Sequence, residues 1–321
     1  MSDYLIRRLA LFLPTALIAS LAVFTIMRIL PGDVAEVILA SGGESGISWE
    51  RGQLEAVRKQ LGLEEPLPIQ YGKWAWSMVN GEFGGRSLFD RKPLTEILAQ
   101  RLPVTALLAF YAILIAVVVS IPLGVLAAVY QDRWPDYLVR VVTIAGNAVP
   151  HFWLALVLIL ALAIVFFWTP PIYYRSLWED PAVHLEKMLW PALVLAWGFS
   201  SNLTRVTRSN MLEVLRQDYV RTARSKGLRE AMVLKRHALR NALIPVVTLA
   251  GLQMGALLGG TVVLEAIFGL PGIGQALVQA AERRDYPVVQ SLSMVLVLFM
   301  LGINLVLDLV YVLIDPRISY R

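Results

Sequence analysis

The stretch Val104–Val129 reads VTALLAFYAILIAVVVSIPLGVLAAV and contains no charged side chain in its 26 residues. A helix crosses the hydrocarbon core of a bilayer with about 20 predominantly apolar residues. The stretch is therefore long enough and apolar enough to span a membrane. It decides the fold class, because a chain assembled from such segments is an all-α membrane protein.

Five further stretches have this character, and we predict a polytopic protein with six transmembrane helices. The other five are Leu9–Leu30, Tyr137–Trp168, Leu189–Leu203, Leu243–Phe268 and Val288–Ile314. The fourth span in chain order, Leu189–Leu203, is the shortest and becomes polar at its end. The third contains Pro150, which lacks a backbone donor and predicts a kink.

The composition agrees with a membrane protein. Hydrophobic residues make up 57% of the chain and charged residues 17%, against about 25% charged in a soluble domain. The chain contains no cysteine, which excludes disulfides and cysteine-rich metal sites. The net charge of +5 gathers mostly in one loop between apolar segments, which argues against binding to nucleic acid.

Basic residues predict the orientation. The segment Arg205–Asn241 holds ten Lys or Arg and three acids, whereas the loops Thr169–Met188 and Ala266–Pro287 are balanced or acidic. Loops rich in Lys and Arg remain on the cytoplasmic side. Arg7 and Arg8 at the start and Arg317 and Arg321 at the end place both termini there too. The first span has 22 residues, longer than a signal peptide core, so we expect it to be uncleaved.

We predict two parts along the chain. Residues 1–103 comprise the first transmembrane helix and a long extracytoplasmic segment, in which Gln53–Leu63 shows the periodicity of an amphipathic helix. Residues 104–314 form a transmembrane domain of five helices, which contains the cytoplasmic loop 205–241.

A short helix is specified inside that loop. Asp218 is suited to cap a helix start, because its carboxylate accepts backbone N–H bonds. Arg224 and Lys226 fall in the last turn, where the helix dipole favours cations. Gly227 suits the left-handed position just past the end. The sequence therefore predicts a helix with both ends defined.

A helix this short is not stable alone in water, so it must dock on something. Tyr219, Val220 and Ala223 share one face, flanked by Arg221 and Arg224, and would fit a partner groove with an apolar floor and an acidic rim. The alternative is a surface helix on a loop that faces lipid phosphates.

The loop closely resembles the coupling loop of ABC importer permeases, in the first permease subunit of the dipeptide/oligopeptide/nickel family. The resemblance rests on the runs Thr207–Leu215, Asp218–Gly227 and Arg236–Pro245. Ala223 and Gly227 match the spacing of the family signature, and Arg221-Thr222-Ala223 replaces its usual Glu-Ala-Ala start. Weaker matches follow in order along nearly the whole chain: Leu61–Leu63, Pro66, Gln70-Tyr71, Gly81–Gly84, Val149–Ala155, Glu265–Gly274, Arg284–Gln290 and Asp315–Arg317.

The resemblance implies a type I ABC importer permease fold and a location in the bacterial inner membrane. It implies that the residues Asp218, Tyr219, Val220, Arg221, Thr222, Ala223, Arg224, Ser225, Lys226 and Gly227 form the coupling helix, which sits in a cleft of the ATPase. The implied partners are a second homologous permease, two ABC ATPases that hold ATP and magnesium, and an extracytoplasmic solute-binding protein. The implied solute is a peptide, with nickel, opines or glycosides as alternatives.

Glycines mark the fifth predicted span. Gly251, Gly255 and Gly259 recur at intervals of four residues, a pattern that lets helices approach closely in lipid. Either simple tight packing or the wall of a pathway fits this pattern. In similar permeases the fifth span lines the pathway.

Polar residues within the other spans give further candidates. Asn304 and Asp308 lie one helical turn apart; buried acids in membranes face the protein interior, so we expect a hydrogen-bonded pair that locks helices, with a proton site as the alternative. Asn147, Pro150 and His151 interrupt the third span and are pathway candidates.

Two other classes of protein compete with this interpretation. The chain has no phosphate-binding loop of the form Gly-x-x-x-x-Gly-Lys-Ser/Thr, and no catalytic or metal-ligand constellation stands out, so we expect a subunit that is not an enzyme. A secondary carrier often shows internal repeats, which we do not find, and it has no use for a capped basic loop helix.

Overall fold

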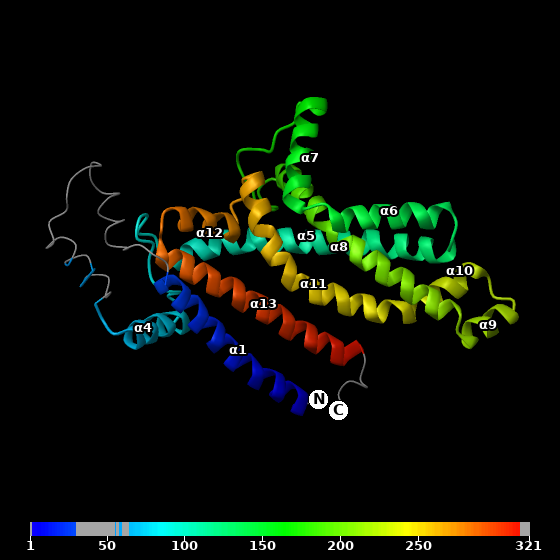
Figure 1. Cartoon of the computed structure of the whole chain (residues 1–321), viewed down its shortest axis with the longest axis horizontal. Coiled ribbons are helices and arrows are strands. Elements are labelled where there is room, and N and C mark those ends of the chain that lie inside the picture. The colour runs from blue at the N-terminus through cyan, green and yellow to red at the C-terminus, as the bar shows by residue number, and fades with distance from the viewer. Residues whose placement is uncertain (1, 30–54, 56–57, 60–63, 315–321) are drawn as a thin grey trace. The chain divides into compact units, whose positions relative to one another are not determined.

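The computed structural model describes residues 2–29, 55, 58–59 and 64–314, and Figure 1 shows its course. Among these residues the regular structure is helical, with a single isolated bridge between Arg86 and Pro93. The prediction of an all-α protein is confirmed. The predicted helix Gln53–Leu63 lies almost wholly outside the described residues, and the motif Asp315–Arg317 lies outside them.

The chain divides into two compact units. One comprises Ser2–Val104 and Pro271–Gly302, and the other comprises Thr105–Leu270 and the end of the chain from Ile303. The first unit contains α1 (Ser2–Ile29), α4 (Leu67–Val79), α12 (Ile273–Glu282), and the first parts of α5 (Leu94–Val129) and α13 (Tyr286–Ile314).

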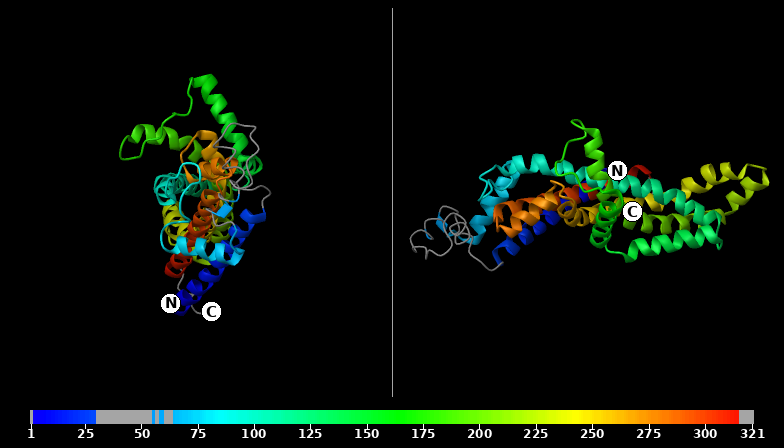
Figure 2. Two further views of the ribbon diagram at one scale, coloured as in Figure 1. Left: turned by 90° about the vertical axis from the view of Figure 1, so that its left-hand side faces the viewer. Right: turned by 90° about the horizontal axis from the view of Figure 1, so that it is seen from above.

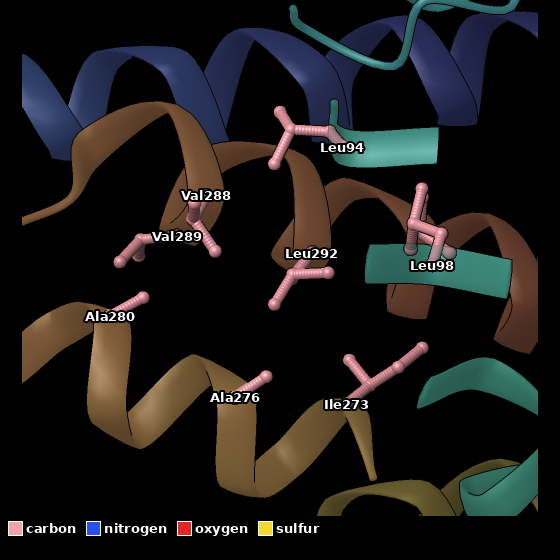
Figure 3. Close-up of a cluster of buried hydrophobic side chains, with 9 residues drawn as sticks. Leu94, Leu98, Ile273, Ala276, Ala280, Val288, Val289 and Leu292 are labelled. Carbon is pink, nitrogen blue, oxygen red and sulfur yellow. The ribbon is translucent and has the colours of Figure 1, made fainter. Parts of the chain in front are cut away.

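The core of the first unit is a cluster of aliphatic side chains. Figure 3 shows side chains from α5, α12 and α13 pointing toward one another: Leu94, Leu98, Ile273, Ala276, Ala280, Val288, Val289 and Leu292. A second cluster joins Phe24 of α1, Trp74 of α4 and Met294 of α13. The Ser20 and Tyr71 hydroxyls share a hydrogen bond of 2.8 Å between α1 and α4.

A buried carboxylate fixes the start of α13. Asp285 is 4% exposed. It accepts a hydrogen bond of 2.5 Å from Ser87 Oγ and one of 3.3 Å from the backbone N–H of Leu88. These bonds tie the segment that follows α4 to the start of α13, which gives the motif Arg284–Gln290 a structural role.

The second unit is built around α8 (Pro181–Leu215). It also holds α6 (Trp134–Ala148), α7 (His151–Phe166), α9 (Asp218–Ser225), α10 (Glu230–Met232), the π-helix η1 (Val233–Ala238) and α11 (Leu239–Phe268). Figures 1 and 2 show α6 and α11 running beside α8. Ala116, Ala196, Leu203 and Val246 pack into one cluster from α5, α8 and α11.

Among the described residues, three helices are long and apolar enough to cross a membrane by themselves. These are Ala10–Ile29, Leu94–Val129 and Tyr286–Val306, and the number rises to five if each of two bent helix pairs forms one span. Exposed large apolar side chains cover these helices, for example Leu13, Phe110 and Val118, as lipid contact requires. The count of six spans stays a prediction.

The predicted third span, Tyr137–Trp168, corresponds to two helices, α6 and α7, and the bend between them is far sharper than the predicted kink. The chain turns by 105° between α6 and α7, and Figures 1 and 2 show α7 projecting away from α6. Val149 has φ −87° and ψ 123°, and Pro150 has φ −63° and ψ 136°. A proline forces the preceding residue out of the helical region, so Pro150 breaks the helix and does not merely kink it.

The predicted fourth span, Leu189–Leu203, falls within α8, which is not among the candidate spans. Polar side chains lower the mean hydropathy of α8, which is why it is not a candidate span. Ser200, Ser201 and Thr207 are buried and donate to carbonyl oxygens of α8 itself. A helix surrounded by other helices does not need a continuous apolar surface. Polar residues of α8 can therefore lie within a membrane protein, because they contact other helices and not lipid.

Candidate functional site

The predicted short helix is present as α9, Asp218–Ser225. Its start differs from the prediction: Gln217 is the N-cap and no side chain caps the helix. Asp218 is the first helical residue, and its carboxylate lies 3.6 Å from the Arg221 guanidinium in place of a capping bond. A negative charge in the first turn still stabilises the helix through the dipole.

The end of α9 agrees with the prediction. Lys226 is the C-cap, and Gly227 follows with φ +77°. The backbone N–H of Gly227 donates to the carbonyl of Arg224 at 2.9 Å. A β-carbon placed on Gly227 would meet no atom within 4 Å. Glycine is therefore required here by backbone conformation and not by lack of space.

The apolar face of α9 packs within the chain itself. Val220 is 0% exposed and Ala223 is 5% exposed, and both contact Val233 of η1. Val214 and Leu215 at the end of α8 and Leu228 complete this cluster. The expectation that Val220 and Ala223 dock in a partner groove is wrong, because the helix has already buried them against its own loop.

Polar contacts attach α9 at two further points. Arg224 donates to Glu230 at the start of α10, with Nη2–Oε1 at 2.7 Å and Nε–Oε2 at 3.2 Å. Asn241 Nδ2, on α11, donates to the Tyr219 hydroxyl at 2.8 Å. The helix is thereby linked to α8, α10, η1 and α11, so any displacement of α9 acts on all four.

The opposite face of α9 is open. Asp218, Arg221, Thr222, Ser225 and Lys226 are all exposed. Charged groups of both signs lie on this face, together with two hydroxyls. Together with the partly exposed Tyr219 and Arg224, this face is accessible to a partner.

A buried ion pair braces the helices behind the loop. Asp136 of α6 is 0% exposed and meets Arg208 of α8 in a two-pronged contact, with Nε–Oδ1 at 2.7 Å and Nη2–Oδ2 at 2.6 Å. The backbone N–H of Asp132 donates to the same carboxylate at 3.0 Å. Nearby, a β-carbon on Gly124 of α5 would lie 2.5 Å from Cβ of Thr207, so α5 and α8 touch closely.

Three predicted pathway residues lie at the break between α6 and α7 and line an open pocket there. A cavity of about 290 Å³ is lined by Asn147, Pro150 and His151, together with Gly198, Phe199 and Asn202 of α8. The His151 ring stacks on Phe199, with 6.2 Å between centroids and 18° between planes. Gly198 faces this ring so closely that a β-carbon there would collide with it. The structure therefore shows that Asn147, Pro150 and His151, which are neighbours in sequence, line one pocket together with residues of α8.

The remaining candidates are more scattered. The axis of α11 turns by 60° between Gly255 and Gly259. Gly251 and Gly255 are buried, whereas Gly259 is exposed and a β-carbon there would meet nothing within 4 Å. Gly259 therefore makes no close helix contact within the chain. Asn304 is half-buried in α13, and the side chain of Asp308 lies outside the described part of the structure.

Several polar pairs in the structure escaped sequence analysis. Arg208 pairs with Asp136 across 72 positions, Thr105 Oγ1 donates to buried Glu265 at 2.7 Å across 160 positions, and His184 contacts the Tyr111 hydroxyl at 3.1 Å. An acid within an apolar run was the available signal for Glu265. No local pattern indicates its partner.

Comparison with known proteins agrees with this architecture. The sequence profile of the family described as "Binding-protein-dependent transport system inner membrane component" matches residues 120–320. A profile for the N-terminal part of such membrane components matches residues 1–109.

Curated relatives are similar over their full lengths. A Brucella suis protein named as a peptide transport system permease is 40% identical over 320 residues, which cover 100% of both chains. The oligopeptide transport system permease protein AppB of Bacillus subtilis is 38% identical over 322 residues, and the glutathione transport system permease protein GsiC of Escherichia coli K12 is 38% identical over 321 residues. Each of these matches also covers 100% of both chains.

Proposed function

The chain belongs to the family of binding-protein-dependent transport system inner membrane components, and we propose that α9 is the element through which partner ATPases drive its transport cycle. The chain is a permease subunit of a binding-protein-dependent ABC importer and a multi-pass inner membrane protein. Its family works with ATPase and solute-binding partners.

The observation that carries the proposal is the two-faced placement of α9. On one face, Val220 and Ala223 pack against α8 and η1, and the residues of the opposite face are exposed. When a partner displaces α9, the helices packed against its apolar face move with it. Asp218, Arg221 and Lys226 are positioned to meet the ATPase.

We propose that the complete importer contains a second homologous permease and two ABC ATPases, which hold the ATP and magnesium. The loop with α9 faces the cytoplasm together with both termini. The charge distribution supports this orientation, because the loop 205–241 carries ten of the chain's 29 Lys and Arg residues. ATP-driven closure of the ATPases would press on α9 and shift α8 and α11.

We propose peptides as the transported solutes. The support is the naming of three relatives as permeases for peptides, oligopeptides and glutathione. The cavity at the α6–α7 break is the candidate passage, because Asn147, His151 and Asn202 offer hydrogen-bonding groups along its lining.

Arg221→Glu tests the coupling role in the intact importer. Arg221 is exposed, and its side chain pairs with Asp218 of its own helix among the described residues, so the folded chain should be unchanged while ATP-driven peptide uptake and ATPase retention fall. Arg133→Glu is the matched control, because it reverses an exposed charge in the loop between α5 and α6. Equal uptake by both variants would contradict the proposal for α9.

Competition experiments test the solute. Uptake of a labelled peptide should be suppressed by other peptides and not by nickel, opines or glycosides. Suppression by one of those solutes alone would replace peptides as the substrate while leaving the coupling proposal intact.

A further inference from the structure

A hollow whose walls are mostly apolar, and whose lining includes four Lys and Arg residues, lies beside α10, η1 and the start of α11, outside α9. It has a volume of about 620 Å³ and is lined by Arg229, Lys235, Arg236 and Arg240, with Ala231 and Met232 between them. All six residues are exposed. The wide turn of the π-helix η1, which contains Lys235 and Arg236, brings these cations onto the wall of one hollow.

These cations lack counter-ions in the part of the chain that the structure describes. Within the described residues, none of the four forms an ion pair. Glu230 is the one acid from Tyr219 to Leu264, and it is already bound to Arg224 at 2.7 Å. Four positive charges in one hollow repel one another, so the hollow favours an anion from outside the chain.

The exposed side chains at the start of α11 change from cationic to apolar within about one helical turn. Arg236 of η1 and Arg240 of α11 are exposed, and Ile244 and Val247 follow them along α11 with exposed fractions of 43% and 39%. Four helical residues correspond to about 6 Å along the axis. A cationic zone followed at this distance by an exposed apolar surface matches the step from lipid headgroup to acyl chain.

Packing on the opposite face of α11 fixes the rotation of this helix about its axis. Ala238 and Ala242 are buried against Ala128 and Met211, and Val246 is buried one turn further on. This packing fixes the rotation of α11 and leaves Arg240 and Ile244 on the outside. The apolar stripe is therefore uncovered within this chain, and the cations lie at its end.

We propose that this hollow binds the phosphate of an anionic phospholipid whose acyl chains lie along Ile244 and Val247. The Arg and Lys side chains hold the headgroup phosphate by charge-assisted hydrogen bonds, and Ala231 and Met232 cover its glycerol. An acidic segment of a partner protein would satisfy the cations but would leave the apolar stripe unexplained. The site is independent of the solute and of the coupling role of α9.

The chain contains no cysteine, so Ile244→Cys introduces one position for a fluorescent label. The labelled full-length chain is placed in nanodiscs that contain brominated phosphatidylglycerol or brominated phosphatidylcholine at equal mole fraction. A juxtamembrane cation contributes on the order of fivefold to the affinity for anionic lipid. Quenching by phosphatidylglycerol should therefore exceed quenching by phosphatidylcholine severalfold, and high salt should reduce the difference.

Arg236→Gln with Arg240→Gln should abolish the preference, and Arg236→Lys with Arg240→Lys should largely retain it. The matched control, Arg205→Gln with Arg216→Gln, removes two exposed charges outside the hollow and should leave the preference unchanged. Equal quenching by the two lipids in the labelled parent would overturn the proposal. So would a preference that survives loss of both arginines, or a label that neither lipid quenches.

Discussion

Gly227 offers a test of α9 that separates backbone strain from packing. Its φ is +77°, and a β-carbon there would meet no atom within 4 Å. A side chain at this position therefore costs conformational energy alone. The left-handed region costs an L-residue about 1–2 kcal/mol, more for a β-branched residue and less for asparagine, which tolerates it.

The strain is comparable to what holds α9 in place. Full burial of a valine side chain contributes roughly 1.5–3 kcal/mol, and Val220 is the one large side chain that α9 buries completely. Gly227→Val should therefore cost a large part of the local stability, whereas Gly227→Asn should cost little. Ala223→Asp should also release the helix, because it buries a carboxylate beside Val233 with a penalty of several kcal/mol.

The assay combines hydrogen exchange of the amides 221–227 with ATP-driven uptake by the intact importer. We expect both protection and uptake to decrease in the order Gly227, Asn, Ala, Val, with the rest of the chain unchanged. If the valine variant keeps full protection and full uptake, α9 does not depend on its glycine end and the account given for the loop is wrong. Protection lost with uptake retained would show that α9 need not be folded for coupling.

Three further predictions address other parts of the chain. Arg208→Met should lower the stability of the detergent-solubilised chain by about 3–5 kcal/mol, because it leaves the Asp136 carboxylate buried without a partner; thermal unfolding should show partial recovery on adding Asp136→Asn, and no recovery would contradict the pairing. An accessibility reporter at Ser225 should report the cytoplasm and one at Ser41 the opposite side; labelling of both from the same side of intact cells would exclude the proposed orientation. Gly255→Leu should reduce uptake or assembly, since Gly255 is buried in α11, whereas normal uptake and a normal complex on size-exclusion chromatography would show that this position tolerates bulk.

The sequence alone determined the features that depend on neighbours in the chain. Uncharged runs such as Val104–Val129 predicted lipid contact, and the loop around Asp218 and Gly227 predicted α9 to within one residue at its start and correctly at its end. Such signals are local, because helix ends and membrane spans are set within a few turns of the residues that specify them. The positive φ at Gly227 could be predicted for the same reason.

Only the tertiary structure decided what each face contacts. The sequence grouped Tyr219, Val220 and Ala223 on one side of α9 but could not say that two of them pack against η1 and leave the charged side for a partner. It marked Pro150 as a kink, but the 105° turn depends on how α6 and α7 each pack against α8. The pair Asp136–Arg208 joins residues 72 positions apart. Contacts between helices that are distant in the chain leave no periodic pattern in the sequence. Which residue a side chain contacts depends on the surface of a helix elsewhere in the chain.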